Sequence, residues 1–99
     1  MSVSFTPETF EPHVGTDFSF ELDDGTEVTT VLASVLRHPT RPDGERIEPF
    51  SLIFEGAPGP ALAQATYCGA HAHLGSLSIF IVPIGPDAAG RQRYEAVFN

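Results

Sequence analysis

Hydrophobic and polar positions alternate with a period of two along several short stretches of this chain. Phe18, Phe20 and Leu22 alternate with acidic and hydroxyl residues, and residues 50–54 (Phe-Ser-Leu-Ile-Phe) repeat the pattern. This period is typical of a β-strand with one buried and one solvated face. The chain therefore predicts β-structure in both of its halves.

The last 25 positions form the clearest strand pair. Residues 77–82 and 93–98 are rich in branched and aromatic side chains, and residues 83–90 between them contain prolines and glycines. We expect two strands joined by a turn that begins at Pro83. Because residues 75–99 contain neither histidine nor cysteine, this hairpin is expected to be scaffold.

Turn residues predict the remaining strands. Asp23-Asp24-Gly25 favours a tight turn after the strand at residues 18–22. Residues 26–37 carry apolar side chains on both parities, as in a long strand with both faces partly covered or one with a face-switching β-bulge. A mobile loop is expected at residues 38–45 and a wide turn at 56–60, followed by a short strand at 66–70 and a turn at 73–75.

A short helix is expected before the first strand. Thr6 is a favourable N-cap, Pro7 suits the first helical position and Glu8 suits the positive end of the helix dipole. A proline and a glycine that follow limit the helix to about one or two turns. Phe5 and Phe10 would anchor it across one end of the sheet.

These elements predict an all-β fold. About six strands must hide one face of an antiparallel sheet, either in a folded sandwich or in a closed barrel. We expect a single small barrel with a short N-terminal helix, because closure removes exposed strand edges. A chain of 99 residues supports one core, so residues 1–99 are expected to form one domain.

Charge narrows the range of partners. The net charge is −8 and the chain has no lysine, so we expect binding to neither nucleic acid nor a membrane surface. All acidic residues except Asp87 and Glu95 lie in residues 1–55. The N-terminal residues lack the features of a secretory signal, no run is long enough for a membrane span, and Cys68 is the single cysteine. A cytoplasmic protein is therefore expected.

His71 and His73 are the candidate metal ligands. At positions i and i+2 of a strand, two imidazoles point to the same face and can hold one ion. The third ligand would come from His13, His38 or a carboxylate. Two solvated histidines beside a turn are the alternative, and we expect neither metal nor cofactor.

Other reactive side chains have simpler interpretations. Cys68 and His71 should lie on opposite faces of a strand, so Cys68 is expected to be a small packed thiol. Three serines within strands, Ser51, Ser76 and Ser78, lack a nucleophile motif. The carboxylate pairs Asp23-Asp24 and Glu45/Glu48 are interpreted as solvated surface. The aromatic residues are expected to fill the core rather than to line a ligand cavity: Phe18, Phe20, Phe50, Phe54, Phe80, Tyr94 and Phe98.

Several motifs resemble a known family. They include Glu-Pro-Phe-Ser-Leu-Ile-Phe at 48–54, Leu-Ala-Gln-Ala-Thr-Tyr at 62–67 and, most specifically, Tyr-Glu-Ala-Val-Phe-Asn at 94–99. The chain resembles short bacterial proteins known as a domain of unknown function, in which the second motif is usually Leu-Pro-Gln-Gly-Thr-Tyr. The resemblance implies genes often located near phage-tail-like collar and fibre proteins, and it carries over no catalytic residue.

Three functions remain open. The leading hypothesis is a non-enzymatic structural or protein-interaction module, accessory to a phage-tail-like assembly, with a protein partner or a second copy bound through a sheet edge or the acidic half. A small-ligand-binding barrel is the first alternative and requires an unfilled aromatic cavity. A metal-dependent enzyme using His71 and His73 is the second.

Overall fold

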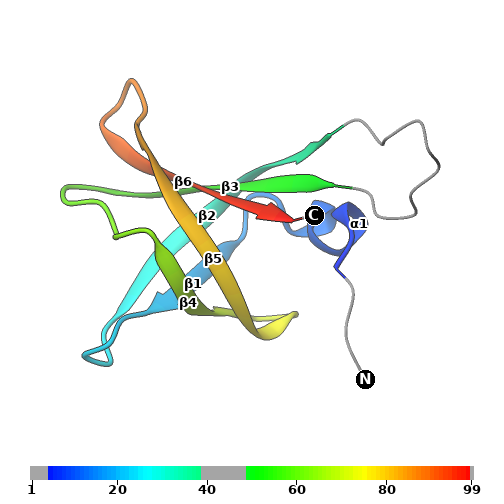
Figure 1. Ribbon diagram of the computed structural model, residues 1–99, viewed down its shortest axis with the longest axis horizontal. Helices are drawn as coiled ribbons and strands as arrows, with labels where there is room; N and C mark the ends of the chain where they lie inside the picture. The colour runs from blue at the N-terminus through cyan, green and yellow to red at the C-terminus, as the bar shows by residue number, and fades with distance from the viewer. Residues whose placement is uncertain (1–4, 39–48, 99) are drawn as a thin grey trace.

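The computed structural model describes residues 5–38 and 49–98. Its six antiparallel strands close into a barrel in the order β1-β2-β3-β6-β5-β4, with β4 returning to β1 (Figure 1). The elements are α1 (Pro7–Phe10), η1 (Glu11–His13), β1 (Asp17–Glu21), β2 (Glu27–Arg37), β3 (Phe50–Pro58), β4 (Ala65–His71), β5 (Gly75–Pro86) and β6 (Arg91–Phe98). The prediction of a six-stranded barrel with a short N-terminal helix is confirmed. The loop expected at 38–45 lies outside the described residues from position 39 onward, as does the Glu45/Glu48 pair.

Aromatic and branched side chains fill the barrel interior. Phe18 and Phe20 of β1 make edge contacts with Phe54 of β3, with ring centroids 5.3 and 5.2 Å apart. Gly69 of β4 leaves room for this packing, since a Cβ there would lie 3.3 Å from the Phe20 ring. The buried core comprises Phe10, Phe18, Phe20, Leu32, Phe50, Leu52, Phe54, Ile79, Ile81, Tyr94 and Ala96.

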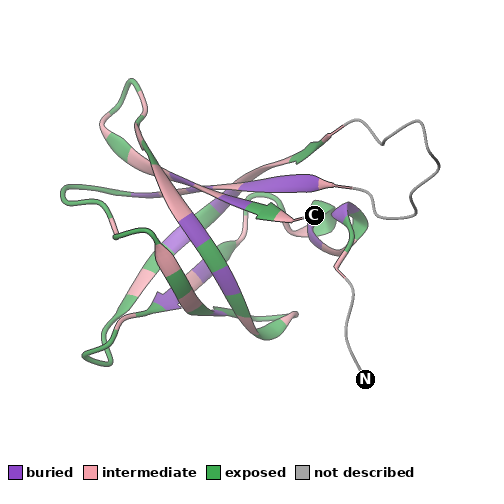
Figure 2. Cartoon of the chain, viewed as in Figure 1, coloured by how far each residue is buried: buried purple, intermediate pink, exposed green. Residues whose placement is uncertain are grey.

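Burial alternates along β5, and this assigns its aromatic residue to the outer face. Ile79 and Ile81 are buried, whereas Phe80 between them is 49% exposed; the alternating bands are visible in Figure 2. The expectation that Phe80 lies in the core is therefore wrong, because the period of two turns it outward.

The helix α1 covers one end of the barrel. Phe10 is fully buried, and its ring centroid lies 5.9 Å from that of Phe50 and 5.7 Å from that of Phe98. Phe5 packs on Phe10 at 5.6 Å, which confirms both predicted anchors. Pro7 is the first helical residue, as expected. Within the described part of the chain, no helix has the length and hydropathy needed to cross a membrane.

Ion pairs connect the helix to the wall of the barrel. The Arg37 guanidinium of β2 donates to both carboxylate oxygens of Glu11, at 3.0 and 2.8 Å, and to Glu8 at 3.3 Å. Hydrogen bonding to Arg37 lowers the pKa of Glu11. All three side chains are solvent-accessible, so these pairs orient the helix more than they stabilise it.

Two irregularities could not be placed from the sequence. The register of β2 against β3 shifts between Leu32 and Ser34, so the bulge was the correct alternative for residues 26–37. The predicted break at Pro83 is wrong, because β5 continues to Pro86. Pro83 pairs with β6, next to a register shift, and β4 pairs with β5 only up to Ile81. A missing backbone N–H is tolerated at such an edge.

β3 also extends further than expected. It reaches Pro58 through Gly56 and Ala57, so the predicted wide turn at 56–60 begins later. Gly56 is buried, and a Cβ there would lie 3.4 Å from the Tyr94 ring. The small residue therefore belongs to the packing of β3 against β6 rather than to a turn.

Candidate functional site

His71, at the end of β4, is the most enclosed of the four histidines. Its exposed fraction is 6%, and its ring centroid lies 4.5 Å from that of Phe18 and 4.6 Å from that of His13. β1 and β4 run side by side, with Ser19 opposite Ala70. Extending this register by one position brings Phe18 to His71, so strand pairing positions the imidazole.

Both ring nitrogens of His71 have hydrogen-bond partners. Nδ1 accepts from the backbone N–H groups of His73 at 3.0 Å and of Leu74 at 3.2 Å. The other nitrogen, Nε2, lies 2.9 Å from the Thr16 hydroxyl oxygen. Since Nδ1 is an acceptor twice, Nε2 carries the proton and donates to Thr16. The Thr16 hydroxyl in turn donates to the carbonyl oxygen of His13.

These bonds make the neutral imidazole a connector between two turns. One side of the ring holds the β4–β5 turn, and the other holds the segment between η1 and β1. Burial lowers the pKa of His71, and the nearby His13 and His73 lower it further. Protonation would place a hydrogen on Nδ1, where two N–H groups already point. The geometry and the pKa direction therefore both favour the neutral form.

The proposed metal pair has unequal surroundings. The His71 and His73 ring centroids are 5.9 Å apart, but His73 is exposed in the turn because β4 ends at His71. The His73 ring stacks on His13 at 5.8 Å. Within residues 5–38 and 49–98, no three His, Cys, Asp or Glu side chains are arranged to hold a metal ion together. The two imidazoles were expected to share a face because residues i and i+2 of a strand do so. This alternation does not apply to His73, which lies in the turn after β4.

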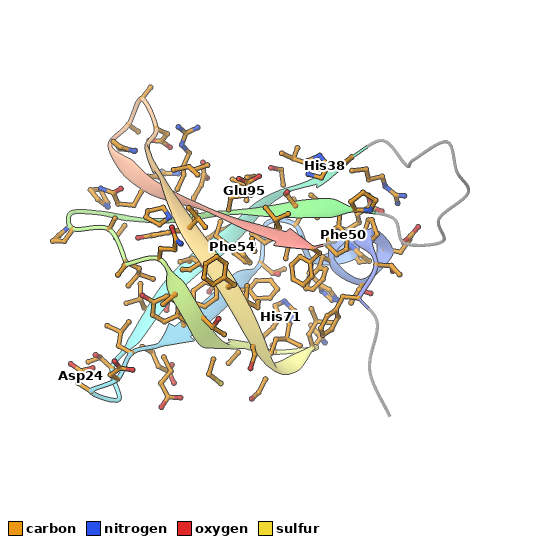
Figure 3. The ribbon with its side chains drawn as sticks, viewed as in Figure 1. Asp24, His38, Phe50, Phe54, His71 and Glu95 are labelled. Carbon is orange, nitrogen blue, oxygen red and sulfur yellow. The ribbon has the colours of Figure 1, made fainter. Side chains whose placement is uncertain are left out.

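A serine–histidine contact was not predicted from the sequence. His38 Nε2 lies 2.8 Å from Ser51 Oγ, within the distance at which a base can act on a nucleophile. The Ser51 side chain is completely buried, so the hydroxyl is closed to a substrate. The contact ties the end of β2 to β3, whose registers place Leu36 opposite Ser51. Figure 3 shows His38 and His71 on separate parts of the molecule.

Other candidates are dispersed. Cys68 is exposed, so the expectation of a packed thiol is wrong, although Cys68 and His71 do lie on opposite faces as predicted. It borders a surface hollow of about 490 Å³ that Tyr67 and Leu22 also line. Asp24 accepts hydrogen bonds from the Thr26 backbone and hydroxyl. It therefore stabilises the predicted hairpin turn, at a distance from both labelled histidines (Figure 3).

The second candidate site is a surface rather than a pocket. Of the six strands, β4 and β5 contain no Asp, Glu, Lys or Arg, and neither does the whole segment 56–86. Phe80 and Ile84 of β5 are 49% and 40% exposed, and Val97 of the neighbouring β6 is 52% exposed. In a chain of net charge −8, an uncharged face with exposed apolar side chains is a candidate contact surface.

The comparisons with known proteins identify the family. Residues 5–98 match the model of a domain of unknown function, DUF6916. No curated protein and no solved structure matches the chain. Since the family model spans nearly all of the sequence, the chain belongs to the DUF6916 family.

Proposed function

We propose that this protein is a non-enzymatic structural or protein-interaction module, accessory to a phage-tail-like assembly in the bacterial cytoplasm. The observation that carries the proposal is the uncharged outer surface of β4 and β5. Charged residues are depleted at the centres of protein interfaces, where apolar and aromatic side chains are enriched. The exposed Phe80 and the charge-free strands around it have this composition.

The arrangement of polar side chains supports a binding role. An active site requires nucleophile, base and stabilising donors to converge on one accessible point. Here His71 holds two turns together, and the Ser51 hydroxyl that contacts His38 is buried. The resemblance to proteins encoded near collar and fibre proteins supports the assembly context.

Affinity capture with matched variants tests the proposal. Tagged protein is used as bait in a lysate of the source bacterium that expresses its tail-like genes. Phe80→Ser removes the exposed ring, and Val31→Ser removes an apolar side chain of 36% exposure on β2, three strands away around the barrel. We expect a tail structural protein at fixed stoichiometry with the wild type and Val31→Ser, and much less of it with Phe80→Ser.

Two results would contradict the proposal. If all three baits capture the same tail protein at equal yield, the uncharged face does not take part in the interaction. If the bait binds no tail protein but converts a small molecule in a metabolite screen, the protein is an enzyme and the proposed binding function is wrong.

A further inference from the structure

The two halves of β5 have different neighbours. Residues 75–81 pair with β4, and residues 82–86 pair with β6. The last residues of β6, 96–98, pair with β3. Within the described residues, no strand pairs with the other side of residues 75–81, which we call the open edge. The barrel is thus closed at one end of β5 and splayed at the other, as Figure 1 shows where β5 and β6 diverge.

The cause of the divergence lies in the core. The Phe98 ring stacks on Phe50, with centroids 4.8 Å apart, and contacts Phe10 of α1 at 5.7 Å. These contacts hold the end of β6 toward β3 and the helix. Continuing the register that pairs Val82 with Glu95 would place Phe80 opposite Val97, yet both side chains remain about half exposed.

The open edge lacks the usual protection against strand addition. Natural edge strands carry charged residues, prolines or bulges that prevent pairing with another chain. Residues 75–81 (Gly-Ser-Leu-Ser-Ile-Phe-Ile) contain no charge and no proline. Their register with β4 is continuous, so no bulge twists the edge away. Such an edge is a template for another strand.

We propose that the open edge pairs antiparallel with the open edge of a second copy of this chain, forming a two-fold dimer. This inference rests on the proposed interaction function and names its first partner. A two-fold contact sets each surface against itself. A two-fold contact centred on β1, β2 or β3 would set the acidic residues Asp17, Glu27 or Glu55 near their own copies, whereas β4 and β5 bring together only uncharged residues.

The side-chain alternation of β5 fits this pairing. Antiparallel addition keeps outward side chains opposite outward side chains. Registers centred on Ser78 or Ile79, which keep most of the pairing within residues 75–81, place Phe80 of one copy opposite Ser76 or Ser78 of the other. Each register covers part of the exposed Phe80 ring without meeting a charge. The outward side chains of both copies would then form one continuous uncharged face for a further partner.

Spin labelling of the native cysteine tests the geometry. Cys68 is the single cysteine, is exposed, and lies opposite Ser78. Across the joined β5 strands, the two Cys68 backbones are separated by three strand spacings, about 14 Å, or about 16 Å in the register centred on Ile79. We expect native mass spectrometry to show a dimer. We expect double electron–electron resonance to give a distance between the two nitroxide labels that agrees with this backbone separation.

Matched lysine substitutions test the edge itself. Ser78→Lys adds a charge to the open edge, whereas Ala70→Lys adds the same charge to the outer face of β4, where strands pair on both sides. We expect Ser78→Lys to weaken dimerisation at least about tenfold, as for loss of a central contact, and Ala70→Lys to leave it unchanged.

The outcomes separate this inference from the proposed function. A dimer whose labels lie about twice the expected distance apart or more, or one weakened equally by both lysines, would overturn the edge pairing. A monomer that still captures a tail protein through Phe80 would overturn the dimer and leave the proposed function standing.

Discussion

Replacing His71 by phenylalanine should separate the structural work of its ring nitrogens from that of its ring. Phenylalanine keeps a planar ring against Phe18, whose centroid is 4.5 Å away. It loses the three hydrogen bonds to Thr16 and to the backbone N–H groups of His73 and Leu74. Each such bond contributes about 0.5–1.5 kcal/mol net, so the expected loss for three bonds is about 1.5–4.5 kcal/mol of unfolding free energy.

Equilibrium unfolding in urea, followed by circular dichroism, measures this loss. A small domain is stable by only about 5–15 kcal/mol, so the midpoint should shift clearly. His73→Phe is the control, because among the described residues the exposed His73 ring has no hydrogen-bond partner that would be lost. Substitution of such a surface residue typically changes stability by about 0.5 kcal/mol or less.

The pH dependence provides an independent test. The pKa of His71 is lowered in the folded protein, so the unfolded chain binds more protons once the pH falls below the ordinary histidine value of about 6.5. The stabilisation by neutral His71 is therefore complete above that value and is lost as the pH falls through it toward the lower folded pKa. His71→Phe lacks this component, so the stability gap between wild type and variant should narrow on acidification.

Two results would refute this reasoning. A loss below about 1 kcal/mol for His71→Phe would show that water replaces the three hydrogen bonds without cost. A stability gap that stays constant between about pH 8 and about pH 5 would show that His71 is not held neutral by the fold.

Three further predictions concern the core and the surface. Phe10→Ala should lower the unfolding free energy by about 3–5 kcal/mol in urea titrations, as expected for a fully buried ring, while Phe80→Ala should cost far less; equal losses would contradict the assignment of faces. Tyr94→Phe should cost about 1 kcal/mol in the same assay, because the Leu62 N–H loses its acceptor at 2.9 Å, and no change would mean that this bond contributes nothing. The Cys68 thiol should react with a disulfide reagent in the folded protein at a rate close to that in urea, whereas strong protection would contradict its exposure.

The local sequence pattern was sufficient to predict those elements whose structure depends on neighbouring residues along the chain. The alternation at Phe18 and Phe20 and at residues 50–54 predicted the strands β1 and β3, and Asp24-Gly25 predicted the turn between β1 and β2. Gly25 adopts a φ of +87° there, a conformation that glycine reaches without steric cost. Thr6 and Pro7 likewise marked the start of α1.

The local sequence pattern gave wrong predictions where the end of a strand or the burial of a side chain depends on pairing with another strand. Pro83 was expected to end a strand, but its place at an edge with a register shift lets β5 continue. Cys68 and Phe80 were expected in the core, and the register of β4 against β5 instead places them outside. Parity within one strand states which residues share a face, but not which face is buried.

The candidate sites depended most on tertiary structure. His13 and His71 are distant in sequence, and only the pairing of β1 with β4 brings their rings to 4.6 Å. The contact between His38 and Ser51 likewise follows from the register of β2 against β3. By itself, the sequence determined the all-β composition, the turns, the helix cap and the charge-free segment 56–86, because these properties depend on residue type and short spacing. Strand order, register and the open edge came from the closure of the barrel, because they depend on how distant segments share one core.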